Sequence, residues 1–169
     1  MILGLSLENF TLLHTIISLI GILTGLIVLY GMLSGRLFPV MTALFLLTTV
    51  LTSVTGFMFP FSVILPSHIV GGLSLVLLAA ALAGLYLFRL DGAWRWIYVV
   101  TAVASLYLNV FVGVVQAFQK VPFLQPLAPT QSEPPFLIAQ SATLLIMVIL
   151  GFLAVRRFRP NMFSGGYPA

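Results

Sequence analysis

The stretch RLFPVMTALFLLTTVLTSVTGFMFPFSVILPSHIVGGLSLVLLAAALAGLYLFR, residues 36–89, decides the fold class, because no charged side chain lies between its terminal arginines. A helix crosses about 30 Å of hydrocarbon with about 20 apolar residues, so this stretch is too long for one span. Pro60 and Pro66 lack the backbone donor that a helix interior requires, and they divide the stretch in two. It therefore predicts two membrane-spanning helices, at about 38–59 and 67–88, joined by a short turn.

The rest of the chain has the same character. Hydrophobic residues make up 61 % of the 169 residues and charged residues 6 %, whereas a water-soluble domain carries about a quarter of its residues as charged side chains. Three more uncharged runs predict spans at about 10–33, 95–118 and 136–155. These runs are apolar at nearly every position instead of alternating, which disfavours a β-barrel. We therefore predict an all-α membrane helix bundle, with five transmembrane helices in one transmembrane domain over residues 1–169.

The cations predict how the bundle is oriented. Those expected on one side of the membrane are Arg36, Arg89, Arg95, Arg156, Arg157 and Arg159, and Lys120 is expected on the other. Because cationic loops stay in the cytoplasm, the N-terminus is predicted outside and the C-terminus in the cytoplasm. The segment 119–135, which holds five of the ten prolines, is then an outer loop. Fixed φ angles and few backbone donors make it either a stiff cap on the bundle or a docking surface.

Small residues recur four positions apart in the first predicted span. Gly21 and Gly25 form one such pair, and Gly31 and Gly35 form another. Helices in lipid approach each other closely at such residues. The pairs predict either packing inside the chain or a face for a homodimer or another membrane subunit. The chain has no basic tract that would bind nucleic acid.

The two histidines are the most specific candidates for a cofactor site. His14 lies about one turn inside the first predicted span, and His68 opens the third, so both are expected in the outer leaflet on parallel helices. Two facing neutral imidazoles are a usual means of holding a b-type haem in a helix bundle. We therefore name both as candidate axial ligands of haem iron. The alternative is that each is an interfacial residue at a helix end.

The predicted span 95–118 has a polar face. Its members are Thr101, Ser105, Asn109 and Gln116. An amide side chain that faces lipid leaves its polar atoms unpaired, so this face is expected to turn inward. Together with Gln140 of the last span, Asn109 and Gln116 are candidates to line an outer pocket for a quinone or another small ligand. The alternative, which the general use of such side chains favours, is interhelical hydrogen bonding. The same face would also serve a channel or carrier for an uncharged solute.

Residues for catalysis or ion coupling are missing from the predicted spans. Apart from Arg95 at the boundary of the span 95–118, they contain no Asp, Glu, Lys or Arg, so a proton relay or an ion-coupled carrier lacks its parts. The chain has no cysteine and no H-E-x-x-H, G-x-S-x-G or phosphate-loop motif. Zinc and copper also lack thiolate or nearby carboxylate ligands. The sequence identifies no catalytic residue and favours a non-enzymatic protein.

Four segments resemble those of a group of small uncharacterised bacterial integral membrane proteins. They are LTSVTGF at 51–57, PSH at 66–68, GAWRWIY at 92–98 and LAPTQSEPP at 127–135. The resemblance implies a bacterial inner-membrane protein and implies no activity or cofactor. By elimination, we expect a non-catalytic integral membrane component that packs into or stabilises a larger inner-membrane assembly of respiratory or photosynthetic type. The alternatives are a haem b and quinol redox protein, and a channel or carrier for an uncharged solute.

Overall fold

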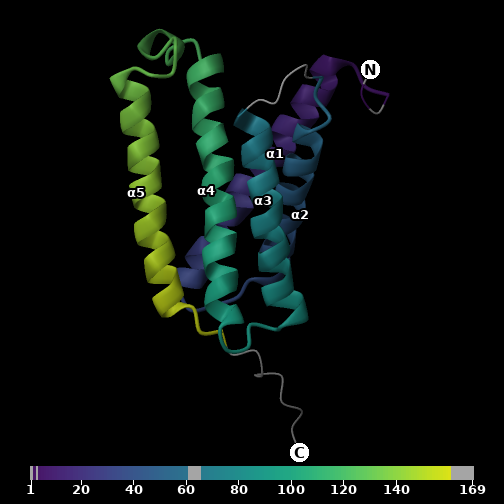
Figure 1. The fold of residues 1–169 in the computed structure, drawn as a ribbon, viewed down its shortest axis with the longest axis vertical. Coiled ribbons are helices and arrows are strands. Elements are labelled where there is room, and N and C mark those ends of the chain that lie inside the picture. The colour runs from purple at the N-terminus through teal and green to yellow at the C-terminus, as the bar shows by residue number, and fades with distance from the viewer. Residues whose placement is uncertain (1, 3, 61–65, 161–169) are drawn as a thin grey trace, which may run out of the picture.

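The computed structural model describes residue 2, residues 4–60 and residues 66–160, which form a bundle of long helices (Figure 1). The helices are α1 (Leu7–Leu33), α2 (Pro39–Gly56), α3 (Pro66–Leu82), α4 (Trp94–Lys120) and α5 (Pro134–Arg157). A π-helical turn, Ala83–Leu87, continues α3, and a 3-10 turn, Gln125–Leu127, lies between α4 and α5. Five helices are long and apolar enough to span a membrane, and the described residues form no strand, which confirms the predicted helical class.

The helix ends follow local chemistry. α1 begins three residues before the predicted span, where the side chain of Ser6 accepts a hydrogen bond from the backbone N–H of Asn9. α2 ends at Gly56, three residues before the predicted limit, and Phe57 closes it with backbone bonds to Val54 and Thr55. The early end agrees with Pro60, because proline disfavours helical backbone at the residue before it.

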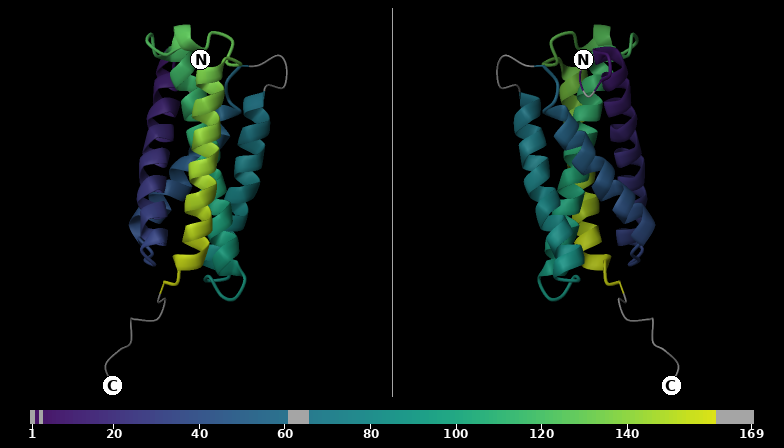
Figure 2. Two further views of the ribbon diagram at one scale, coloured as in Figure 1. Left: turned by 90° about the vertical axis from the view of Figure 1, so that its left-hand side faces the viewer. Right: turned by 90° about the vertical axis from the view of Figure 1, so that its right-hand side faces the viewer.

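α4 is the central helix of the bundle, since it packs against α1, α2, α3 and α5. α2 lies between α1 and α3 and crosses the bundle obliquely (Figure 2). The largest fully buried side chains include Tyr98 and Leu106 of α4 and Phe45 of α2. Helices that lie in lipid are stabilised by close packing of such side chains more than by the hydrophobic effect.

The small residues of α1 serve packing inside the chain. A Cβ atom added at Gly25 would lie 2.6 Å from Leu106 Cδ1 and 2.9 Å from the ring of Phe45. One added at Gly31 would lie 3.0 Å from the carbonyl oxygen of Arg36. These glycines let α1 approach α2, α4 and its own following turn, as the interpretation of packing within the chain predicts.

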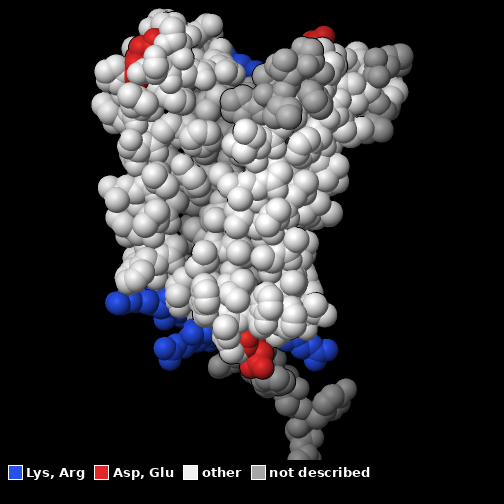
Figure 3. All heavy atoms as spheres, in the orientation of Figure 1, with Lys and Arg blue, Asp and Glu red and all other residues white. Residues whose placement is uncertain are grey.

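Cations gather at one end of the molecule (Figure 3). This end holds the turns after α1 and α3 and the end of α5, and so contains Arg36, Arg89 and Arg156. There Arg95 Nη1 donates a 2.8 Å hydrogen bond to the carbonyl oxygen of Phe158, which ties the start of α4 to the end of α5. The start of α1 and the loop between α4 and α5 lie at the opposite end (Figure 1).

The loop between α4 and α5 packs on the helices that it joins. Ala128 is buried beside Phe118 of α4 and Phe136 of α5. Glu133, the residue before α5, accepts hydrogen bonds from the hydroxyl and backbone N–H of Thr130 and from the backbone N–H of Ser132. The carboxylate therefore fixes the turn that leads into α5.

Candidate functional site

His14 is fixed by a hydrogen bond across α1 and α2. Its Nδ1 atom lies 2.7 Å from Thr55 Oγ1, and the Thr55 hydroxyl donates its proton to the carbonyl oxygen of Leu51 at 2.7 Å. If the Thr55 hydroxyl keeps its bond to Leu51, His14 Nδ1–H is the donor and Thr55 Oγ1 the acceptor. This arrangement leaves Nε2 of His14 with its lone pair. The ring packs edge-on against Phe59, with 5.2 Å between ring centroids.

His68 lies on α3 and contacts the same end of α2. Its ring is 5.6 Å from the ring of Phe57, with 36° between the ring planes. The structure thus brings both histidines to the C-terminal end of α2 but packs each against a different phenylalanine. A haem with two histidine ligands needs both rings to offer a nitrogen to one iron. The pairing of His14 with His68 around a haem stays a prediction.

The three amide candidates have different surroundings. Asn109 is half-buried, and its Nδ2 atom faces Gly21 of α1. Gln140 is buried, and its Nε2 donates a 3.1 Å hydrogen bond to the carbonyl oxygen of Phe111, which joins α5 to α4. Gln116 is exposed. Gln140 therefore makes an interhelical hydrogen bond, and a common pocket lined by the three amides stays a prediction.

α2 contributes buried hydroxyls that sequence analysis did not single out. Thr42 and Thr49 are each 1 % exposed, and their Oγ1 atoms make no hydrogen bond to the described residues. Three further buried atoms, Thr52 Oγ1, the hydroxyl oxygen of Tyr98 and Asn109 Nδ2, also make no hydrogen bond to the described residues. The spacing of seven between Thr42 and Thr49, which repeats on one face of a helix, was the available signal. Tyr98 gave none, because its position near a helix end was also typical of an interfacial aromatic residue.

Most other hydroxyls in these helices pair with their own backbone. Thr24, Thr48 and Thr101 each donate at 2.7 Å to the carbonyl oxygen four residues earlier. Ser105, which belongs to the predicted polar face, does the same at 2.9 Å. This local pairing is the usual state of a hydroxyl inside a transmembrane helix. The unpaired threonines of α2 are therefore exceptions.

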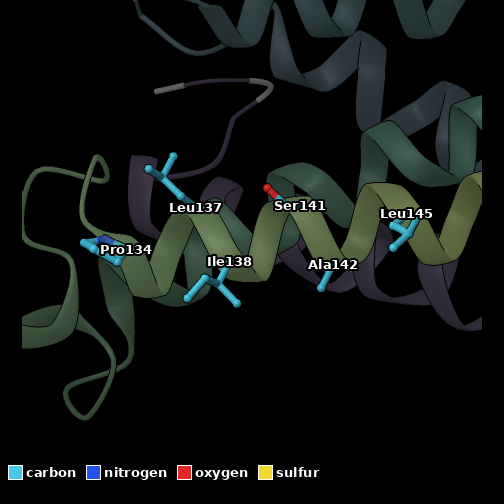
Figure 4. Close-up of a pocket in the computed structure, with 6 residues that line it drawn as sticks. All are labelled: Pro134, Leu137, Ile138, Ser141, Ala142 and Leu145. Atoms are coloured by element: carbon cyan, nitrogen blue, oxygen red, sulfur yellow. The ribbon is translucent and has the colours of Figure 1, made fainter.

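A shallow groove of about 470 Å³ lies on the outer face of α5 (Figure 4). Its lining consists of Pro134, Leu137, Ile138, Ser141, Ala142 and Leu145. Five of these six side chains are apolar, and none belongs to the predicted haem or quinone residues. The groove offers shape and apolar surface for contact, and no group for catalysis.

No family model, curated protein or solved structure matches the chain.

Proposed function

We propose that this protein is a non-catalytic component of a larger inner-membrane assembly and that it binds its partner through α5. The observation that carries the proposal is the low burial of this helix. In its most apolar window, 17 % of α5 is buried inside the chain, against 28 to 39 % for the other four helices. α5 therefore has the most surface left for another membrane helix.

The face of α5 that points away from the bundle has small side chains between larger ones, a pattern that favours helix packing in lipid. Ser141 and Ala142 form a low region between the larger side chains of Ile138 and Leu145. Helices associate in lipid where small residues let a neighbour approach closely. A partner helix that inserts a large apolar side chain over Ala142 would fill this groove.

The charge distribution supports an inner-membrane location with the N-terminus outside. Arg36, Arg89 and Arg156 mark one end of the bundle, and Lys120 ends α4 at the other. Loops rich in arginine and lysine remain in the cytoplasm of bacterial cells. The proposed orientation places the groove of α5 in the outer half of the membrane, since α5 begins at Pro134 on the outer side.

Two substitutions, each of which adds a large side chain to an exposed helix surface, test the proposal. The full chain is isolated from native membranes in a mild detergent, beside Ala142→Phe and the control Val76→Phe, which fills an exposed site on α3. We expect the wild type and Val76→Phe to migrate in a complex that contains a second protein, and Ala142→Phe to lose that protein. A chain that migrates alone, a complex of this chain only, or equal loss in both variants contradicts the proposal.

A channel or carrier for an uncharged solute is the second candidate, favoured by the unpaired polar atoms between α2 and α4. Polar groups inside a membrane bundle mark pathways and binding sites more often than lipid contacts. Solute flux into proteoliposomes that falls in Asn109→Leu supports this candidate. Flux equal to that of protein-free vesicles contradicts it.

A further inference from the structure

Five buried polar atoms on α2 and α4 make no hydrogen bond to the described residues. They are Thr42 Oγ1, Thr49 Oγ1, Thr52 Oγ1, the hydroxyl oxygen of Tyr98 and Asn109 Nδ2. The two helices are in contact with each other. Inside a membrane no bulk solvent reaches such atoms, so each requires an internal partner.

Three polar side chains meet at Gly21, where α1, α2 and α4 come together. The position that a Cβ of Gly21 would occupy is 3.0 Å from Asn109 Nδ2, 3.2 Å from Thr48 Oγ1 and 3.3 Å from Thr49 Oγ1. The Thr48 proton is used by the carbonyl oxygen of Leu44, so Thr48 can only accept another bond. The amide of Asn109 thus faces acceptors on α2 without pairing with them directly.

A second pair lies nearer the end of the bundle that carries the arginines. Tyr98 is 0 % exposed and its hydroxyl lies beside Thr42, without a hydrogen bond of regular geometry. Thr42 is seven residues before Thr49 on α2, which is about 10 Å along a helix. Two polar clusters therefore follow one face of α2, each with its second member on α4.

We infer that α2 and α4 bind internal water, which bridges Thr49 to Asn109 beside Gly21 and Thr42 to Tyr98. Polar groups that meet without a direct hydrogen bond of regular geometry are commonly joined in this way. The bound molecule must accept a hydrogen bond from the Asn109 amide and donate one to a hydroxyl oxygen, and water can do both. This inference does not depend on the proposed partner of α5.

The change in Tm when a hydroxyl is removed distinguishes a hydrated interior from a dry one. In a dry interior, replacement of an unpaired threonine by the isosteric valine removes an unmet polar group and leaves the Tm unchanged or raised. With bridging water, Thr49→Val and Thr42→Val lower the Tm by about 2–4 °C in lipid nanodiscs, because a hydrogen bond is lost. Thr24→Val is the matched control, since Thr24 bonds only to its own helix.

Transfer of magnetisation from water to the protein in solid-state NMR gives the second measurement. We expect water signals at Thr49 and Tyr98 in the full chain in lipid. The Thr49 signals persist in Thr49→Ser, which keeps the hydroxyl, and signals at neighbouring Asn109 are lost in Thr49→Val. Absence of magnetisation transfer from water in the wild type overturns the inference. It does so even if Thr49→Val lowers the Tm, because that loss would then come from a direct hydrogen bond between Thr49 and Asn109. An unchanged or raised Tm in both valine variants also overturns it.

Discussion

At the scale of single residues, the clearest interaction is the bond between His14 and Thr55. It joins α1 to α2 near the end of α2, and the second bond of Thr55, to Leu51, favours the tautomer of His14 that carries the proton on Nδ1. A fixed tautomer with a free Nε2 is how a histidine is prepared to bind a metal. The same bond also serves as an interhelical contact with no ligand.

Replacement of Thr55 by valine tests this tautomer. We expect Thr55→Val to lose about 1 kcal/mol of stability, which is typical of one interhelical hydrogen bond. Nitrogen-15 NMR of His14 should change from an Nδ1–H ring to a mixture of tautomers. Thr15→Val is the control, because Thr15 is exposed and bonds to the carbonyl oxygen of Thr11. An unchanged His14 spectrum in Thr55→Val contradicts the assignment.

The haem hypothesis is tested at the same residue. If His14 and His68 ligate one iron, protein purified with haem shows a b-type band in the reduced-minus-oxidised spectrum. His14→Ala and His68→Ala should each remove the low-spin band, since either change takes away one axial ligand. A wild-type protein without the band contradicts haem binding, and a band that survives both changes contradicts these ligands.

At the scale of elements, the approach of α1 to α2 and α4 depends on glycine at position 25. An added methyl group meets Leu106 and Phe45 on two different helices at less than ordinary contact distance. Gly72 of α3 is the opposite case, since nothing lies within 4 Å of the Cβ position there. The two glycines have the same helical backbone and differ in their neighbours.

We expect Gly25→Ala to destabilise the bundle by about 1–3 kcal/mol, the cost of overpacking a filled interior. Gly72→Ala should be neutral or stabilise the protein by up to about 1 kcal/mol, because alanine favours the helix. Unfolding by denaturant in mixed micelles measures both. Equal effects of the two changes would show that the contact at Gly25 is not tight.

The turn before α5 depends on the ionised form of Glu133. Desolvation raises the pKa of this carboxyl, but the hydrogen bonds from Thr130 and Ser132 outweigh it and hold the pKa below its ordinary value. A lowered pKa in the folded chain means that the carboxylate stabilises the turn above the ordinary pKa of a glutamate. That contribution disappears as the pH falls through the lowered value.

Acidification should therefore open this turn while the helices persist. We expect the amide protons of Thr130 and Ser132 to lose their protection from hydrogen exchange below about pH 4, after correction for the intrinsic exchange rate. In Glu133→Gln the pH dependence should be absent. Protection that is the same at pH 3 and pH 7 in the wild type contradicts the role given to the carboxylate.

At the scale of the whole molecule, the two ends of the bundle differ in charge and in structure. One end carries Arg36, Arg89 and Arg95, with Arg95 bonded to the carbonyl oxygen of Phe158. The other end carries the loop around Ala128, packed on α4 and α5. The proposed orientation follows from this asymmetry.

Reporter fusions test the orientation. A reporter active only in the cytoplasm should function after Arg36 and after Arg159, and one active only outside should function after Gln131. Replacement of Arg36, Arg89 and Arg95 by glutamine should weaken this preference, because it removes cations that hold the inner loops in place. The reverse pattern in the wild type contradicts the proposed topology.

The sequence by itself determined the number of helices, their approximate limits and the end where cations gather. These features depend on local properties, namely the length of uncharged runs and the position of Pro60 and Pro66 between two of them. The π-helical turn Ala83–Leu87 and the positive φ angles of Arg89 and Leu90 left no such local signal. The π-helical turn and the two positive φ angles lie where the end of α3 meets the start of α4, and there Gly84 packs against Trp94 and Tyr98.

Tertiary structure alone decided which faces of the helices meet. A helix that is apolar all round has no periodic signal to fix its rotation, so neither the contact of His14 with Thr55 nor that of His68 with Phe57 followed from the sequence. The spacing of Thr42 and Thr49 placed both on one face of α2, but did not show which neighbouring helix that face meets. A hydroxyl that bonds to its own helix is tolerated anywhere in a span. Only the tertiary structure showed that the hydroxyls of Thr42 and Thr49 make no such bond.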